Sequence, residues 1–254
     1  MTFTEIPPVE RLVCIVREAM NCGDMPMIER IVLAYRGTPY EAALLEHPEL
    51  EALLPALREQ YCIYETNDEW ALRAGLIATP EKGFGGSTPI ARTFAYVPLE
   101  AVAAGIEDGA RYCHVGSGPL PETLLALRNF VGRAQLTGVD QSAEAIQLSR
   151  EFVQVFAPRS AISFLHAAGD DLDYRGFTHI HVAALVRPEY GTVQSICDTA
   201  DDNVVLLLRT VSGLGSLVYQ PLAAETESLL EARGFKRAAT VRGHAIMQTA
   251  IYRR

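Results

Sequence analysis

A glycine-containing turn between a β-type run and an apolar helical run is the feature that most constrains the fold. The β-type run spans residues 111–116 and leads into a turn that reads Gly116-Ser-Gly-Pro-Leu-Pro121. Glycine permits the positive φ angles of a tight turn and lets a ligand come close to the backbone. A second β-type run at 135–139 ends in Asp140, where nucleotide-binding folds hold ribose hydroxyls. The pattern is typical of a nucleotide site, although similar spacings also occur in plain strand-to-helix turns.

The rest of the C-terminal half repeats this alternation of short β-type runs with helical segments. Further β-type runs lie at 161–166, 179–184 and 204–208. Alternation of this kind predicts a parallel sheet with helices on both faces. A helical segment at 222–233 precedes a last pair of β-type runs, 235–241 and 245–252, which we expect to be antiparallel. The predicted α/β topology is similar to that of class I S-adenosylmethionine-dependent (Rossmann-like) folds.

The N-terminal part has a different pattern. Residues 9–78 carry apolar side chains at spacings of three and four, a periodicity that predicts helices, with Asn21 and Thr38 as expected caps. Residues 79–89 are rich in Gly and Pro and lack periodicity, which predicts a flexible connection or lid. We therefore expect a smaller all-helical domain at residues 1–95 and a Rossmann-like domain at 96–254.

The composition of the chain limits the classes of molecule that it is expected to bind. The chain has 254 residues, of which 49% are hydrophobic, so it can bury a large core. Its net charge of −9 argues against a nucleic-acid partner, because phosphate binding needs clustered basic residues. No apolar run is long enough to span a membrane, and the five cysteines form no Cys-x-x-Cys pair, which suits a reducing compartment. We expect a soluble cytoplasmic protein that acts on a small molecule.

Several blocks of sequence together resemble one family. In the C-terminal half they are His-Val-Gly116-Ser-Gly-Pro-Leu-Pro121, His181-Val-Ala-Ala-Leu-Val186, and Leu-Leu-Arg209-Thr followed by Tyr219-Gln-Pro. In the N-terminal half they are Glu65-Thr-Asn-Asp-Glu69 and Phe94-Ala-Tyr96. In this order they resemble nicotianamine synthase and its bacterial relatives that make opine metallophores of the staphylopine and pseudopaline type. The combination is far more specific than a glycine-rich loop alone.

The chain departs from the family pattern in a few places. The gap between the two N-terminal blocks is a few residues longer, which a glycine-rich insert at 83–87 would absorb. Thr210 replaces a serine and Ala95 a proline. Gly169 stands where the family tends to have aspartate, and Asp170 follows it. The family pattern therefore indicates the adenine contacts near these two residues less directly than it indicates the other contacts.

The resemblance implies a particular reaction of S-adenosylmethionine. The family transfers the 3-amino-3-carboxypropyl (aminobutanoyl) group and releases 5'-methylthioadenosine. Because a sulfonium has three carbons open to attack, the pocket must present the methionine γ carbon to the acceptor amine. The resemblance assigns the S-adenosylmethionine contacts to Gly116, Ser117, Gly118, Pro119, Asp140, Gly169, Asp170, Ala183 and Leu185.

The resemblance also suggests roles for side chains that act on the amino acids. Glu65 aligns with a buried carboxylate of the family and would take the proton of the acceptor amine, whereas an unaligned Glu65 would simply face solvent. Tyr96 would donate its hydroxyl to the carboxylate of the donor, although a tyrosine among apolar neighbours is usually a core residue. Arg209 and Tyr219 are further candidates for amino-acid binding, with Arg209 alternatively paired to a nearby acid. Arg36 would bind the carboxylate of the acceptor, or lie in solvent.

Two other constellations are weaker. His179-x-His181 would put two imidazoles on one strand face, but the matching family positions are apolar and no third ligand is spaced nearby, so we expect no metal in the enzyme. Ser117 lies between two glycines, yet the Gly-x-Ser-x-Gly pattern of a hydrolase nucleophile is absent.

We therefore expect a single transfer onto histidine, which the short chain favours, with a helical domain that closes over the donor domain. The product would pass to an opine dehydrogenase, and the protein would form a homodimer. Three alternatives stay open: a nicotianamine-type enzyme that adds several units, an ordinary S-adenosylmethionine-dependent methyltransferase, and a sensor that binds the donor without chemistry. D- and L-histidine are not distinguished by the sequence.

Overall fold

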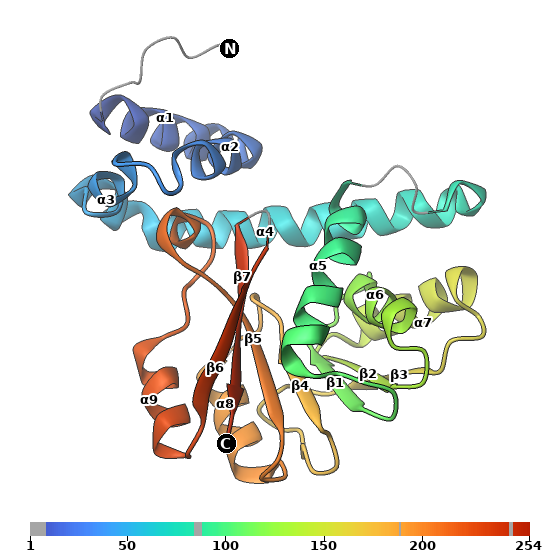
Figure 1. Ribbon diagram of the computed structural model, residues 1–254. Helices are drawn as coiled ribbons and strands as arrows, with labels where there is room; N and C mark the ends of the chain where they lie inside the picture. The colour runs from blue at the N-terminus through green and yellow to red at the C-terminus, as the bar shows by residue number, and fades with distance from the viewer. Residues whose placement is uncertain (1–8, 84–87, 188, 244–245) are drawn as a thin grey trace.

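A seven-stranded sheet lies at the centre of the C-terminal part, and helices of the N-terminal part lie across one of its ends (Figure 1). The computed structural model describes residues 9–83, 88–187, 189–243 and 246–254. No helix within these ranges is long and apolar enough to cross a membrane.

The strands follow one another in the order β3-β2-β1-β4-β5-β7-β6. The first five are parallel, and β7 runs antiparallel between β5 and β6. The predicted parallel sheet and the antiparallel final pair are both confirmed. Ligands of such sheets bind at the carboxyl ends of the strands where the order reverses, here between β1 and β4. The strand bounds are β1 (Arg111–Val115), β2 (Gln135–Asp140), β3 (Ile162–His166), β4 (His179–Val182), β5 (Val205–Val211), β6 (Lys236–Arg242) and β7 (Met247–Arg253).

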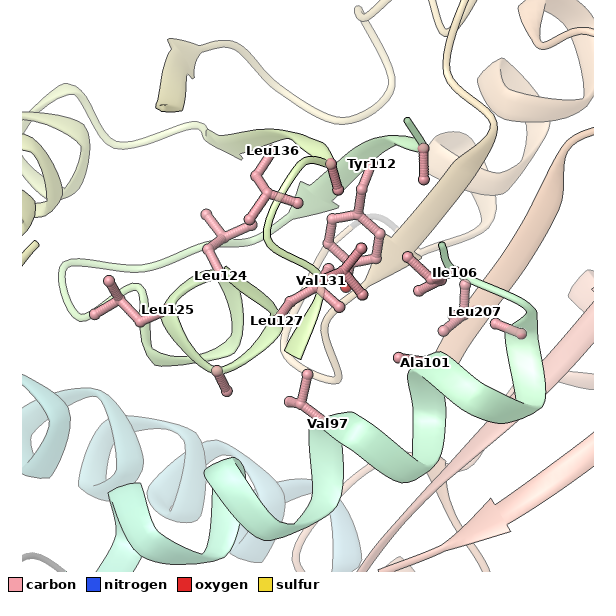
Figure 2. Close-up of a cluster of buried hydrophobic side chains, with 14 of the residues drawn as sticks. Val97, Ala101, Ile106, Tyr112, Leu124, Leu125, Leu127, Val131, Leu136 and Leu207 are labelled. Carbon is pink, nitrogen blue, oxygen red and sulfur yellow. The ribbon is translucent and has the colours of Figure 1, made fainter. Parts of the chain in front are cut away.

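Helices cover both faces of the sheet. On one face, Val97 and Ala101 of α5 and Leu124 of α6 pack against Tyr112 and Leu207 of the sheet (Figure 2). On the other face, α8 and α9 enclose a second apolar cluster. Burial of side chains such as Leu124 is worth roughly 2 kcal/mol each and holds the layers together. The helix bounds are α5 (Thr88–Ala104), α6 (Glu122–Phe130), α7 (Ala143–Phe156), α8 (Glu189–Thr199) and α9 (Ala224–Ala232).

The N-terminal part is helical, as predicted. The caps differ from expectation, because Asn21 lies inside α1 and Asp24 caps α2 by accepting from the Met27 N–H at 3.0 Å. Thr38 is not the N-cap of α3, which is Pro39; its hydroxyl instead donates to the Tyr35 carbonyl at the end of α2, at 2.6 Å. The helices are α1 (Val9–Cys22), α2 (Met25–Tyr35), α3 (Tyr40–Leu45) and α4 (Pro48–Ala78).

These helices are anchored to the loop that follows β5. The apolar faces of α1 to α4 enclose Leu214 and Leu217 of a 3-10 segment, η2 (Gly213–Leu217). Glu41 accepts a hydrogen bond from the Leu214 N–H at 2.8 Å, and Arg58 donates one to the Ser216 carbonyl at 2.7 Å. The long helix α4 is thereby fixed above the carboxyl ends of the strands (Figure 1).

The described part of the connection between the two parts includes a short turn. Residues 80–82 form a short 3-10 turn, η1 (Pro80–Lys82), while 84–87 of the expected glycine-rich insert lie outside the described residues. The expected division between residues 95 and 96 falls within the continuous helix α5. Ile90, Val97 and Ala101 of this helix all belong to the core on the sheet. The division into two domains at that point stays a prediction.

Candidate active site

A cleft of about 740 Å³ lies between α4 and the carboxyl ends of the parallel strands. It brings together residues that are far apart in the sequence, among them most of the predicted site. Two predicted residues, Arg36 and Asp170, are not among the described residues that line it. The predicted residues that do line it are Glu65, Tyr96, Gly116, Ser117, Gly118, Pro119, Asp140, Gly169, Ala183, Leu185, Arg209 and Tyr219.

The glycine turn after β1 forms one wall of the cleft. Gly116 and Gly118 have φ angles of 77° and 64°, which favour glycine. A Cβ atom at Gly116 would lie 2.6 Å from Val186 Cγ2, and one at Gly118 would lie 2.3 Å from Glu69 Oε1. The Gly118 N–H donates to Asp140 Oδ2 at 2.9 Å, which fixes the carboxylate beside the turn. The turn thus presents bare backbone next to an oriented acid.

Gly169, at the next loop of the cleft, is confined by its neighbours. A Cβ atom there would lie 2.7 Å from Thr192 Oγ1 and 2.9 Å from Val115 Cγ1. An aspartate, which the family tends to have here, would not fit this packing without movement. Tyr174 donates to the Gly169 carbonyl at 2.7 Å and holds the loop in place.

Glu65 of α4 faces the cleft between two tyrosines. Tyr219 donates its hydroxyl to Oε2 at 2.7 Å, and the Tyr61 hydroxyl lies 3.2 Å from Oε1. Burial raises the pKa of the Glu65 carboxyl, the nearby charge of Glu29 raises it further, and the hydrogen bond from Tyr219 opposes both. Glu65 is therefore held in the cleft rather than on a solvated helix face.

Two further carboxyls, those of Glu69 and Glu122, also line the cleft. Glu69, one helical turn after Glu65, accepts from the Leu120 N–H at 3.2 Å, and burial raises its pKa to about 8. Glu122 accepts from the Thr93 hydroxyl at 2.9 Å, and burial raises its pKa as well. Sequence reasoning missed Glu122, although its position at the start of the helix after Pro121 was a usable signal. The described residues that line the cleft include six acids, Glu29, Glu65, Asp68, Glu69, Glu122 and Asp140, against three arginines, Arg92, Arg187 and Arg209.

Arg209 belongs to a buried network beneath the cleft. Its Nη2 lies 3.1 Å from Glu100 Oε2 and its Nε 3.3 Å from Oε1, while Nη1 donates to the Thr123 hydroxyl at 3.1 Å. Arg209 thus pairs with a nearby acid, which is the alternative left open by its sequence. Burial raises the pKa of Tyr96 to about 12, and its hydroxyl lies 2.9 Å from the Val241 carbonyl and 3.0 Å from a second protein oxygen. In this structure the Tyr96 hydroxyl hydrogen-bonds to protein oxygens of the sheet.

Two imidazoles lie side by side, and the first of them, that of His114, lines the cleft. His114 of β1 and His181 of β4 are paired in register, and their ring centroids are 4.9 Å apart. Neither ring nitrogen of His114 has a hydrogen-bond partner among the described residues. Burial lowers the pKa of both imidazoles well below the usual value, so both are neutral. The described residues contain no cluster of three or more possible metal ligands around His179, His181 or elsewhere.

Comparisons with known proteins find relatives of this sequence. No family model matches the chain. It is 32% identical over 124 residues to an L-histidine 2-aminobutanoyltransferase of Pseudomonas aeruginosa, a match to 48% of this chain and 47% of that protein. It is 30% identical over 126 residues to the protein of the same name from Yersinia pestis, with 50% and 47% covered. The matched segment therefore spans about half the length of these curated relatives.

Solved structures match over almost the whole chain. MtNAS in complex with MTA and tNA, and a variant of MtNAS in complex with S-adenosylmethionine, each have a TM-score of 0.81 at 20% identity and cover 97% of this chain and 96% of theirs. The chain has the nicotianamine synthase fold. A magnesium protoporphyrin IX methyltransferase from Synechocystis with bound SAH has a TM-score of only 0.52, with 16% identity over 74% of this chain and 100% of that one. The resemblance to nicotianamine synthase and its bacterial relatives, predicted from the motifs, is confirmed.

Proposed function

We propose that this protein transfers the aminobutanoyl (3-amino-3-carboxypropyl) group of S-adenosylmethionine to an amine of histidine and releases 5'-methylthioadenosine. The observation that carries the proposal is Glu65, a half-buried carboxylate that two tyrosines hold in the same cleft as the glycine turn. The similarity to two L-histidine 2-aminobutanoyltransferases over half their length supports histidine as the acceptor.

The residues at the glycine turn fit the donor. Gly116 and Gly118 leave room beside the backbone, and the oriented Asp140 can accept hydrogen bonds from a ribose diol. Ala183 and Leu185 line the cleft beyond the turn and can contact an adenine ring. When bound, S-adenosylmethionine supplies a sulfonium leaving group. The chain itself supplies position, charge and a proton acceptor.

The acidic lining suits cationic reactants. Six carboxyl groups and three arginines line the cleft, and a bound sulfonium or ammonium group would be stabilised by the carboxylates that are ionised beside it. A carboxyl whose pKa is raised toward neutrality is also a better base than an ordinary glutamate. Glu65 would first attract the acceptor amine and then take up its proton.

The runner-up activities predict other products. A nicotianamine-type enzyme would lengthen the acceptor by two or more units, and a methyltransferase would leave S-adenosylhomocysteine. A methyltransferase is less favoured, because its solved structures match this chain far less well than MtNAS does. The homodimer, the dehydrogenase that would take up the product, the cytoplasmic location, and the roles of Tyr96, Arg36 and Asp170 stay predictions.

Mass spectrometry tests the proposal. Purified protein is incubated with S-adenosylmethionine and, in separate tubes, L-histidine, D-histidine or no acceptor. We expect methylthioadenosine and a histidine adduct with one aminobutanoyl unit in one of the histidine tubes. S-adenosylhomocysteine would point to the methyltransferase, and bound but unconsumed donor would point to the sensor.

A further inference from the structure

Hydrogen bonds link three side chains, Glu65, Tyr61 and Glu29, in a series that leads from α4 to α2. Tyr61, one turn before Glu65 on α4, has its hydroxyl 3.2 Å from Glu65 Oε1. The same hydroxyl donates a short hydrogen bond to Glu29 of α2. Tyr61 is only 1% exposed, whereas Glu65 and Glu29 are both half-buried and line the cleft. Glu65 is the end that a bound acceptor amine would cover, so Glu29 is the end from which a proton can leave to solvent.

The hydrogen bonds that link Glu65, Tyr61 and Glu29 leave room for one more proton. A phenol has a single proton, so Tyr61 can donate to only one of the two carboxylates at a time, and the relay starts from the state in which it donates to Glu29. The contact between the Tyr61 oxygen and Glu65 Oε1 has no proton of its own while Glu65 is ionised. A proton placed on Oε1 turns that contact into a hydrogen bond from Glu65 to Tyr61. The arrangement is thus ready to receive one proton at Glu65 and to pass one on through Tyr61.

Among the described residues, the other hydrogen-bond partner of Glu65 offers no second exit. Tyr219 directs its proton to Oε2 and is buried, with 7% of its surface exposed. Asp68 of α4 adds negative charge near Glu65 and, with Glu29, favours the protonated form of that acid. Burial and nearby acids raise the pKa of Tyr61, so the proton passes by a concerted shift and no tyrosinate forms.

We propose that Tyr61 and Glu29 form a proton relay that carries the proton released by the acceptor amine from Glu65 to solvent. The relay rests on the proposed aminobutanoyl transfer. As the new N–C bond forms and the C–S bond breaks, the amine gives one proton to Glu65 Oε1. Glu65 passes that proton to the Tyr61 oxygen while Tyr61 passes its own to Glu29, and Glu29 releases it to water. Each group returns to its starting state, and the thioether leaves without a proton.

Single-turnover kinetics with excess enzyme tests the relay, because product release then does not limit the rate. The variants are Glu29→Gln and Tyr61→Phe. Tyr35→Phe is the matched control, because Tyr35 is buried on α2 and is not among the described residues that line the cleft. We expect both relay variants to transfer about 10- to 100-fold more slowly, the control to match wild type, and the dissociation constant for S-adenosylmethionine to stay within about twofold throughout.

Buffer rescue separates proton transfer from simple positioning of Glu65. In Glu29→Gln, rising concentrations of N-methylmorpholine, a small tertiary amine base, should restore the rate, because the base can accept a proton where Glu29 did. In Tyr61→Phe the missing link is buried and the same base should have no effect. Wild-type rates in both variants, or a slow Glu29→Gln that the base does not restore, would overturn the relay alone. A wild-type protein that forms no histidine adduct would instead overturn the proposed function and the relay with it.

Discussion

Glu65 is held by the hydroxyls of Tyr61 and Tyr219, and burial keeps its pKa above that of an ordinary glutamate. We expect Glu65→Gln to lower kcat by about 100-fold or more, because the amide cannot take up a proton. The donor's dissociation constant should change by about twofold at most, since the Glu65 carboxyl hydrogen-bonds to Tyr61 and Tyr219, whereas Gly118 hydrogen-bonds to Asp140. Wild-type kcat should fall with decreasing pH as Glu65 becomes protonated, with a midpoint above the ordinary glutamate pKa.

A pH profile of kcat for both proteins is the measurement. The acidic limb of the wild-type profile should be missing from the profile of Glu65→Gln. If that variant kept the same acidic limb at a similar rate, another group would be the proton acceptor, and Glu69 would become the first candidate, because burial raises its pKa to about 8.

His114 is a buried polar residue whose ring lies against the imidazole of His181. Its ring is 4% exposed, and neither nitrogen has a partner among the described residues. An unsatisfied buried polar group costs about 1–3 kcal/mol, and an apolar side chain of similar shape avoids that cost. We expect His114→Phe to raise the free energy of unfolding by about 1 kcal/mol, measured by urea denaturation. His179→Phe is the control and should destabilise, because the His179 ring lies 3.3 Å from the Ala104 carbonyl, within hydrogen-bonding distance.

The turn after β1 is in direct contact with α4. Gly118 has a positive φ angle, and a methyl group there would collide with the Glu69 carboxyl. We expect Gly118→Ala to weaken S-adenosylmethionine binding by about tenfold or more, measured by isothermal titration calorimetry. Gly23→Ala is the matched control, because Gly23 has φ 71° but no described atom within 4 Å of its virtual Cβ. The control should cost about 1 kcal/mol of stability and leave binding unchanged. Equal binding in both variants would show that the turn tolerates a side chain.

Elements were more predictable from the sequence than the contacts between them. The alternation of apolar runs is a local signal, so the sheet, its antiparallel edge and the glycine turn could all be predicted. The cap of α2 could not, because Asn21 and Asp24 offer the same chemistry and only the end of α1 decides between them. The roles of Tyr61 and Glu29 were missed for a similar reason. Tyr61 meets Glu29 across 32 residues, and Tyr219 meets Glu65 across 154, and no spacing rule reports such pairs.

At the scale of the whole molecule, the N-terminal helices and the sheet are joined by buried contacts. Leu214 and Leu217, in the loop after β5, lie in the same apolar cluster as the faces of α1 to α4. Arg73 of α4 donates to the Leu148 carbonyl of α7 at 3.0 Å and is 7% exposed. Helices fixed at two such places lose much of their buried surface if the sheet unfolds. We therefore expect the chain to unfold in one cooperative transition.

Two optical signals can test this, because Trp70 of α4 is the single tryptophan of the chain. Its fluorescence reports on the N-terminal helices, whereas far-ultraviolet circular dichroism reports on the whole molecule, and the two urea transitions should coincide. Leu214→Ala should lower the free energy of unfolding by about 2–5 kcal/mol in both signals, because it opens a cavity where the two parts meet. Leu99→Ala, at a side chain that is 56% exposed, should shift neither by more than about 0.5 kcal/mol. A fluorescence transition at lower urea would instead mean that the helices unfold independently, as two separate domains would.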